Sequence, residues 1–340
     1  MKKEISLQPE ASLHSLIYSG TDKEAYAELA RLAEIVGIDI KYAEKFSHSQ
    51  GILNFTTVGC PEGKVTAHFH ELFAPYFAKG QLQLDYRQDT SDILELMVAV
   101  GATIRGKVLG VIGAQGGCGV SVLALWLARR LATNEQIAVL DMNPASAGIE
   151  LLLGAVDTPG KRWADLQGDG SLLAGRLQNA LPSWKSIKFL SADERGGVPL
   201  DNDSGIKAIA ALAQVNEWTI LDLSPAAPIS PAENPWLEWC DYILLVSAVS
   251  NLALAQAELK LQQLGREVPV AVAAVNAKSQ NQLAYIKKSL QLDEVYRLRH
   301  SRNFSADIEH GITPGDRQKS LTDQDVRVIC QKFYASEKCR

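Results

Sequence analysis

A glycine-rich stretch between residues 108 and 123 offers the clearest chemistry in this sequence. It runs Val-Leu-Gly-Val-Ile-Gly-Ala-Gln-Gly-Gly-Cys-Gly-Val-Ser-Val-Leu, so an apolar run leads into closely spaced glycines and then into a helical stretch. Glycine permits positive φ angles and close backbone approach, which lets successive N–H groups converge on an anion. The N-terminus of the following helix favours the same negative charge. The pattern predicts a phosphate-binding loop between a strand and a helix.

The candidate phosphate-binding positions form one run: Gly113, Gln115, Gly116, Gly117, Cys118, Gly119, Val120, Ser121 and Val122. Ser121 stands where such loops place a magnesium-binding hydroxyl. The alternative is that the glycines only allow a strand and a helix to pack tightly. The spacing, the serine and two downstream aspartates favour the phosphate loop.

The elements that must position this loop follow from the pattern around it. From Lys107 onward apolar strands alternate with helices, which is typical of a doubly wound parallel sheet. We expect strands at 107–113, 136–141, 186–191, 218–222, 241–247, 268–275 and 294–298. We expect helices at 120–132, 204–216, 252–265, 280–290, 304–311 and 321–335. The proline-rich segment from Ser224 to Pro235 suits neither element and is a candidate lid loop.

Residues 1–100 have a different pattern and predict a smaller α/β domain before the phosphate-loop domain at 107–340. Strands are expected at 14–19, 38–42 and 52–58, and helices at 22–36 and 89–100. Residues 59–80 fit either period.

Composition limits the function classes. The net charge of −5 argues against nucleic acid as the main partner. No apolar run reaches the roughly 18 residues that a membrane span needs. The five cysteines are scattered without a CxxC pair, so neither disulfides nor a zinc site is expected. We expect a cytoplasmic protein with no membrane span.

The run Gly113 to Val122 resembles the deviant Walker A loop of MinD/ParA proteins. That family carries one lysine that crosses a dimer interface and another that bridges the β- and γ-phosphates; Gln115 and Val120 occupy those positions here. A charge-assisted hydrogen bond contributes about 1.5–3 kcal/mol, so losing two weakens phosphate binding by about 3–6 kcal/mol, or roughly a hundredfold to ten-thousandfold. The resemblance therefore implies that ATP or ADP with magnesium is bound weakly or not at all, with little or no ATPase activity.

The same resemblance assigns roles downstream. Asp141 matches the first acidic residue of the family's second motif, and Asn143 replaces the water-positioning acidic residue, so no catalytic residue is expected. Asp222 resembles a Walker B aspartate, and magnesium ligation falls to Ser121, Asp141 and Asp222. Asn276 stands where the family contacts the base. The alternatives are a helix N-cap for Asp141 and a simple turn residue for Asn276.

The segment from Tyr296 to Ile312 resembles the arginine-bearing turn and helix of CpaE/TadZ proteins, relatives of MinD in Tad (Flp) pilus assembly. The nearest branch is the actinobacterial CpaE-like one, also labelled septum-site-determining protein. Its members carry a receiver-like domain before the P-loop domain. No aspartate ends the 52–58 strand here, so residues 1–100 are expected to form a pseudo-receiver that binds partners.

The resemblance implies a localisation or assembly scaffold for Tad-type pilus or secretion machinery, forming a homodimer and recruited to the cell pole or the inner face of the membrane. An active MinD-like ATPase that regulates septum placement or pilus localisation through an ATP-dependent dimer is the alternative, and a DNA-partitioning ATPase is disfavoured by the charge. We expect His68, His70 and Glu71 to lie at the surface or to pack rather than to bind a metal. Arg299, His300 or Arg302 is expected to contact a nucleotide, a partner or solvent. The proline-rich segment around Trp236 and Trp239 is expected to offer apolar surface for pairing.

Overall fold

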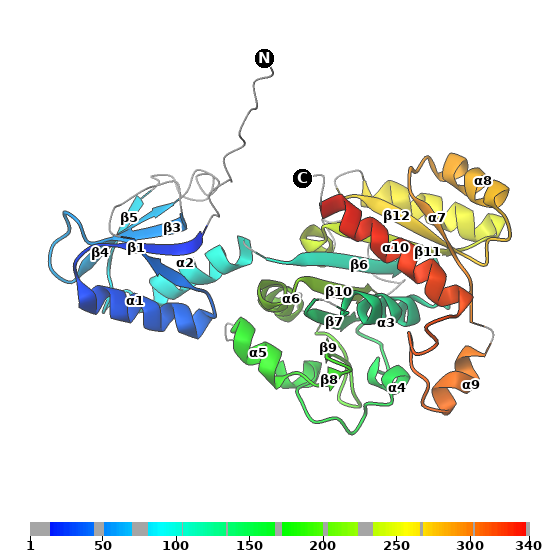
Figure 1. Cartoon of the computed structure of the whole chain (residues 1–340), viewed down its shortest axis with the longest axis horizontal. Helices are drawn as coiled ribbons and strands as arrows, with labels where there is room; N and C mark the ends of the chain where they lie inside the picture. The colour runs from blue at the N-terminus through cyan, green and yellow to red at the C-terminus, as the bar shows by residue number, and fades with distance from the viewer. Residues whose placement is uncertain are drawn as a thin grey trace, which may run out of the picture. The chain divides into compact units, whose positions relative to one another are not determined.

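The protein, a computed structural model, divides into two compact units, Met1–Ile104 and Arg105–Arg340 (Figure 1). The structure describes residues 14–43, 51–69, 81–103, 105–133, 135–166, 172–199, 203–223, 234–265, 268–301 and 303–337. The lid segment expected from Ser224 lies outside these residues up to position 233, as do His70, Glu71 and Arg302.

The first unit pairs a five-stranded sheet with two helices among its described residues. Its elements are β1 (His14–Ser19), α1 (Lys23–Val36), β2 (Ile40–Tyr42), β3 (Gly51–Thr56), β4 (Lys64–Phe69), β5 (Gln81–Asp85) and α2 (Thr90–Thr103). Helix α1 begins after Asp22, whose carboxylate accepts hydrogen bonds from two backbone N–H groups at 2.9 and 3.0 Å. It ends at Gly37, whose φ of 84° suits a glycine cap.

The strand order β2-β1-β3-β4-β5 is that of a flavodoxin-like sheet, the class that includes receivers. β1 runs parallel to β2 and β3, but β4 runs antiparallel to both β3 and β5. A regular receiver sheet is parallel throughout, so the reversed direction of β4 departs from that pattern. Alternate residues of β4, Val65 and Ala67, are buried, which suits a strand with one covered face. The pseudo-receiver role of this unit stays a prediction.

The second unit is an eight-stranded sheet covered by helices. Its strands are β6 (Lys107–Gly113), β7 (Ile137–Met142), β8 (Ser183–Trp184), β9 (Ile187–Leu190), β10 (Trp218–Leu223), β11 (Tyr242–Ala248), β12 (Val270–Val275) and β13 (Val295–Leu298). Its helices are α3 (Val120–Leu131), α4 (Glu150–Leu153), α5 (Ala174–Ala180), α6 (Asp203–Val215), α7 (Asn251–Leu264), α8 (Gln280–Leu290), α9 (Phe304–Glu309) and α10 (Leu321–Glu337), with short 3₁₀ turns η2 (Trp163–Leu166) and η3 (Pro235–Trp239).

The strands run in the order β13-β12-β11-β6-β10-β7-β9-β8, and all neighbours are parallel except β8 and β9. Side chains of β6 alternate between two cores, with Val108 and Ile112 in one and Leu109 and Val111 in the other. From β6 the chain passes to β7, toward the β8 edge of the sheet. From β10 it passes to β11, on the other side of β6 and toward the β13 edge. In such sheets ligands bind beyond the carboxyl ends of the strands where the order changes direction.

The expected fold class, a doubly wound parallel sheet, is confirmed. Strands and helices predicted in the second unit begin and end within two residues of the observed ones. The short elements β8, α4 and α5 were not predicted, because they are too short to show a period.

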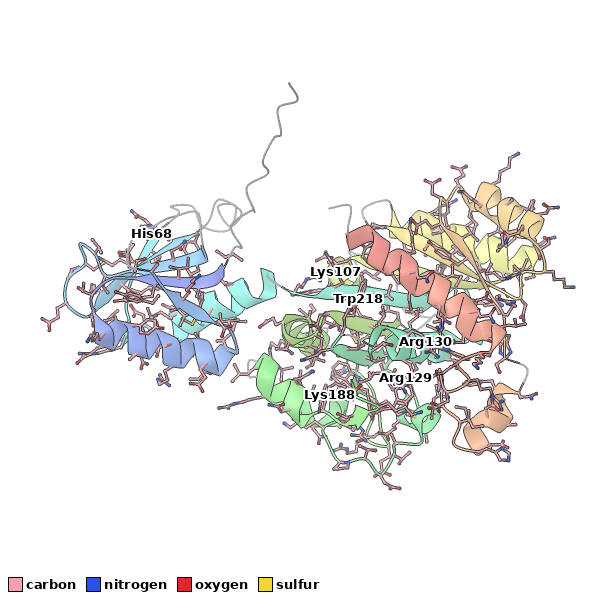
Figure 2. The ribbon with its side chains drawn as sticks, in the orientation of Figure 1. His68, Lys107, Arg129, Arg130, Lys188 and Trp218 are labelled. Carbon is pink, nitrogen blue, oxygen red and sulfur yellow. The ribbon has the colours of Figure 1, made fainter. Side chains whose placement is uncertain are left out.

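Helix α10 is a core element of the second unit. Its apolar side chains Val326, Ile329 and Phe333 are buried in the same core as α3. Asp323, fully buried at its start, accepts hydrogen bonds from Trp126 Nε1 at 3.0 Å and from the Nε of an arginine on α3 at 2.5 Å. The arginine that donates to Asp323 is Arg130, which is labelled in Figure 2. Within the described residues, no helix combines the length and the apolar composition needed to cross a membrane.

We expect Asp323→Ala to lower the free energy of unfolding of the second unit by about 3–5 kcal/mol, because it strands a largely buried arginine. The control is Arg327→Ala, which removes a half-exposed partner of the same carboxylate at 2.9 Å and should cost less than about 1 kcal/mol. Urea denaturation followed by tryptophan fluorescence reports on this unit alone, since all six tryptophans lie in it. Equal losses of free energy of unfolding for the two variants would contradict the role of Asp323 in holding α10 against α3.

Candidate functional site

The loop between β6 and α3 has an open, glycine-dependent backbone. Gly117 and Gly119 have φ of 75° and 82°, in the left-handed region that L side chains rarely adopt. A Cβ added at Gly116, Gly117 or Gly119 would meet nothing within 4 Å. Gly117 and Gly119 are therefore needed for the path of the loop, and none of the three glycines is needed for tight packing. The packing alternative fails for these three positions, and the loop is left accessible to a ligand.

Two aspartates lie directly opposite each other on neighbouring parallel strands. Asp141 on β7 pairs in register with Asp222 on β10. Their side chains are among the buried polar groups, at 1% and 5% exposure. Neighbouring strands lie about 4.8 Å apart, so the sheet register holds two carboxylates close together in a poorly hydrated place.

Burial raises the pKa of both carboxyl groups. For Asp222 the loss of hydration and then the charge of Asp141 raise the pKa to about 7, against an opposing hydrogen bond from Ser121. For Asp141 the loss of hydration is again the largest cause of a raised pKa. Near neutral pH the pair therefore holds a proton for part of the time, and a divalent cation could replace it.

The hydrogen bonds of Asp141 leave one oxygen available. Its Oδ1 accepts from the N–H of Asn143 at 3.2 Å, whereas Oδ2 is buried without a hydrogen-bond partner in the described part of the chain. Asn143 uses its own side-chain oxygen to accept from the N–H of Ala145 at 3.2 Å. The orphaned carboxylate oxygen, the second carboxylate and the hydroxyl of Ser121 are the hard oxygen donors that magnesium prefers. The residues present fit a magnesium ion.

A pocket of about 310 Å³ joins the loop to this acidic pair. Its walls contain most of the residues predicted from the sequence: Gln115, Gly117, Cys118, Gly119, Val120, Ser121, Val122, Asp141, Asn143 and Asp222. Sequence reasoning missed three further wall residues, Ser146, Leu152 and Leu223, because no motif marks them. Gly113 lies at the end of β6 and Gly116 at the tip of the loop, outside the wall. That the pocket takes a nucleotide stays a prediction at this point.

Asn276 has a structural task in the turn after β12. Its φ is 61°, its N–H donates to the carbonyl of Leu298 at 2.7 Å, and its side-chain oxygen accepts from the N–H of His300 at 3.0 Å. These bonds close the turn toward β13, so the turn role is present, and a contact with a base stays a prediction. Arg299 binds Asp325 through two hydrogen bonds of 2.7 and 2.6 Å, so its charge is already neutralised within the fold.

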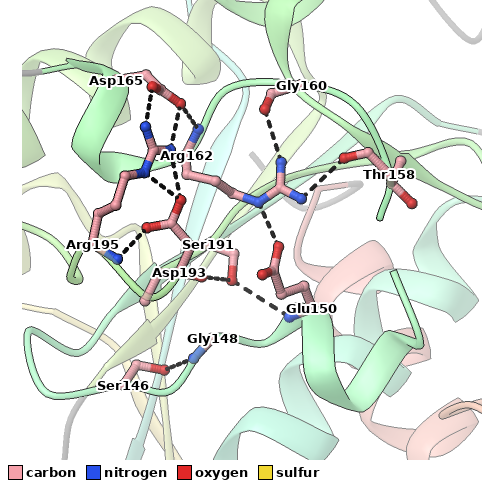
Figure 3. Close-up of polar contacts among 11 residues, drawn as sticks. Ser146, Gly148, Glu150, Thr158, Gly160, Arg162, Asp165, Ser191, Asp193 and Arg195 are labelled. Atoms are coloured by element: carbon pink, nitrogen blue, oxygen red, sulfur yellow. Dashed lines mark hydrogen bonds and ion pairs between the residues drawn. The ribbon is translucent and has the colours of Figure 1, made fainter. Parts of the chain in front are cut away.

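A buried ion pair fixes the segment that follows Asp141. Arg162 donates from Nε to Glu150 at 2.5 Å, and its other nitrogens donate to the carbonyls of Gly160 and Thr158 at 3.0 and 3.1 Å (Figure 3). Arg162 and Glu150 are each 5% exposed. Desolvation offsets much of the attraction in such a pair, so its main effect is on geometry.

Two further contacts seat this segment on the sheet. The indole Nε1 of Trp163 donates to the backbone carbonyl of Asp141 at 2.7 Å. Gly148 has a φ of 100°, and a Cβ there would lie 2.5 Å from the carbonyl of Ala192, so only glycine fits. The backbone around Asp141 and Asn143 is thus held in place before any ligand binds.

One cation near the loop was not found from the sequence. Lys260 on α7 donates from Nζ to the carbonyl of Gly113 at 2.9 Å. The sequence carried a weak signal, because Lys260 follows Ala257 and precedes Leu264 at helical spacing on the buried face of α7. Without the fold, nothing connects that face to a loop 147 residues earlier.

We expect Asp222→Asn to stabilise the second unit in a pH-dependent way. Folding raises the pKa of Asp222 from 3.8 to about 7. The favourable contribution of its protonated form to the free energy of unfolding is therefore complete below pH 4 and is lost as the pH rises through 7. The increase in free energy of unfolding caused by the substitution should reach up to about 4 kcal/mol at pH 8 and be smaller at pH 5. Tryptophan-monitored urea denaturation at both pH values measures it. A gain that does not change with pH would argue against a buried, partly protonated pair.

No protein-family model matches the chain. Over 156 residues it is 33% identical to two proteins of Mycobacterium tuberculosis, the uncharacterised protein Rv3660c of strain H37Rv and its counterpart MT3760 of strain CDC 1551. The match covers 45% of this chain and only 43% of the length of each relative.

Solved structures resemble the chain over about two thirds of its length. The MinC:MinD cell division complex of Aquifex aeolicus gives a TM-score of 0.55 at 15% identity, covering 68% of this chain and 96% of that chain. A ParA family ATPase from Chlorobium tepidum gives 0.54 at 17% identity, covering 67% and 98%. The septum site-determining protein MinD of Pyrococcus horikoshii, complexed with Mg-ADP, gives 0.51 at 14%, covering 67% and 96%. At these identities the likeness is one of fold, and the chain contains the P-loop fold of the ParA and MinD ATPases.

Proposed function

We propose that this protein is a ParA/MinD-like P-loop protein that binds a magnesium nucleotide weakly, hydrolyses it little, and works as an assembly scaffold. One observation carries the proposal. The pocket keeps the acidic pair Asp141 and Asp222 and an open glycine loop, but places neutral Gln115 and Val120 where the family it resembles has lysines. Such a site has the parts for holding a metal and phosphates and lacks the loop cations that drive phosphoryl transfer.

In the proposed complex, backbone N–H groups of the glycine loop and the N-terminus of α3 cradle the phosphates. Ser121, Asp141 and Asp222 offer oxygen atoms to magnesium, and Asn276 lies at the turn expected to meet the base. Magnesium bound with the nucleotide would supply a divalent cation to the acidic pair. Because the surrounding backbone is already fixed by the Glu150–Arg162 pair, little reordering opposes binding.

Weak hydrolysis is supported by the chemistry of residue 143. An amide can hold a water molecule but cannot take its proton. The side-chain oxygen of Asn143 is also engaged by the N–H of Ala145. A cationic group at the transferred phosphoryl is worth roughly 10³–10⁵ in rate, and neither Gln115 nor Val120 carries one.

We expect ATP turnover of the full chain to be indistinguishable from that of Asp222→Ala, because neither protein can both charge-stabilise the transition state and activate water. Phosphate release with magnesium ATP measures this, and calorimetry with magnesium ADP tests the weak binding. The gain-of-function variant Val120→Lys with Asn143→Asp should raise turnover. Wild-type turnover that Asp222→Ala abolishes would instead favour the active MinD-like ATPase.

The proposed partners are proteins of a Tad-type pilus or secretion machine, with recruitment to the cell pole or the inner face of the membrane. This part rests on the CpaE/TadZ-like segment from Tyr296 to Ile312 and on the smaller unit before the P-loop unit. That unit keeps a receiver-like strand order and has Thr56 rather than an aspartate at the end of β3. A sheet without a phosphoacceptor there is suited to docking rather than to signalling by phosphorylation.

Self-association is proposed to use surface other than the predicted tryptophans. Trp236 is 4% exposed, so the expectation that its side chain offers surface for pairing is wrong. Trp239 is partly buried against the core, with Arg105 over its ring, and residues 224–233 of the expected surface lie outside the described residues. Leu151 lies in α4 and Val156 follows that helix; each is 53% exposed. Leu152 of α4 lines the pocket. Apolar surface beside the pocket mouth suits a homodimer contact.

We expect assembly to be independent of ATP. Without a lysine that crosses the interface, two facing triphosphates would repel each other in a partly dry contact, where Coulomb interactions are strong. Light scattering should give the same mass with and without magnesium ATP, for the chain alone and mixed with a purified Tad-type secretion ATPase, with Asp222→Ala as control. A monomer that dimerises only with ATP would contradict the scaffold role, and no complex with the secretion ATPase would contradict the pilus assignment.

A further inference from the structure

The loop that lacks its own lysines is contacted by a lysine from another helix. Helix α7 follows β11, which pairs with β6 so that Val246 lies opposite Gly113. Lys260 lies on the α7 face that also carries the buried Ala257 and Leu264. Its side chain is half-buried, and its Nζ donates to the carbonyl of Gly113, the residue at which β6 ends and the loop begins.

A second residue of the loop, Cys118, acts electrostatically on Lys260. Burial lowers the pKa of its ammonium group, and the Cys118 thiol acts on it in the opposite direction. Cys118 lines the pocket that also contains Ser121 and the acidic pair. The ammonium group therefore lies at the start of the phosphate loop and interacts electrostatically with Cys118, and an anion bound there would offset its loss of hydration.

We propose that Lys260 is the phosphate-binding cation of this protein, supplied by α7 in place of the lysines missing at Gln115 and Val120. The inference rests on the proposed nucleotide site and deepens it. A lysine can act from a distant point in the chain because its ammonium is a point charge on a long flexible stem. Arg299, the other candidate cation in the described residues, is bound to Asp325 by two hydrogen bonds.

The competing explanation is that the hydrogen bond from Lys260 to the Gly113 carbonyl only holds the loop in its conformation. The phosphate-binding role and this structural role differ in which ligands they affect. A cation that replaces the lysine missing at Val120 acts on the β-phosphate, which ADP has and AMP lacks. A bond that only holds the loop conformation affects the binding of both nucleotides equally. The comparison of ADP with AMP therefore separates them.

The experiment is titration calorimetry of the full chain with magnesium ADP and with AMP. We expect Lys260→Met to weaken ADP binding roughly 10- to 100-fold, the loss of one charge-assisted hydrogen bond, and to leave AMP nearly unchanged. The matched control Lys287→Met removes an exposed lysine from α8 and should change neither. Adding Val120→Lys to Lys260→Met should restore ADP binding.

A second measurement needs no variant. Since burial lowers the pKa of Lys260 and a phosphate would raise it again, ADP binding by the wild type should take up protons at alkaline pH, as shown by calorimetry in two buffers of different ionisation enthalpy. Unchanged ADP binding in Lys260→Met, an equal loss for AMP, or no proton uptake would overturn this inference and leave the nucleotide site standing. A wild type that binds no ADP would overturn both.

Discussion

The site depends on one constraint, the close approach of two buried, poorly hydrated carboxylates, those of Asp141 and Asp222. The parallel pairing of β7 with β10 puts Asp141 opposite Asp222, and neither can move without changing the register of the sheet. Two buried like charges repel strongly, so the pair is tolerated only with a shared proton or a cation. A fold indifferent to ligands would have little reason to keep such a pair. Its presence is the strongest physical argument that this edge of the sheet binds something positive.

The rest of the site can be understood as support for that pair. The glycine loop leaves space above it, and Ser121 lowers the pKa of Asp222 by hydrogen bonding. The Glu150–Arg162 pair and the Trp163 indole hold the backbone around Asp141. Rigid support of this kind favours binding, because the ordering is complete before a ligand arrives.

In the proposed site, an acidic pair that can hold a metal, without the loop lysines, separates nucleotide binding from turnover. Magnesium and backbone N–H groups can hold a phosphate chain, whereas fast phosphoryl transfer also needs cations that act on the transition state and a group that activates water. A cation delivered by α7 strengthens the first property and does not require the second. A protein that binds a nucleotide but hydrolyses it little suits the proposed scaffold better than an ATPase that cycles between two states.

The sequence alone determined the parallel α/β fold, because buried parallel strands are near-continuous apolar runs that the pattern reveals directly. It also located the glycine loop, Ser121 and the two aspartates at strand ends. Only the tertiary structure decided that Asp141 and Asp222 are register partners, that Lys260 reaches Gly113, and that Trp236 is buried. It also decided the antiparallel direction of β4, since short half-exposed strands carry no signal for direction. Each of these depends on contacts between residues far apart in the chain, which local periodicity cannot encode.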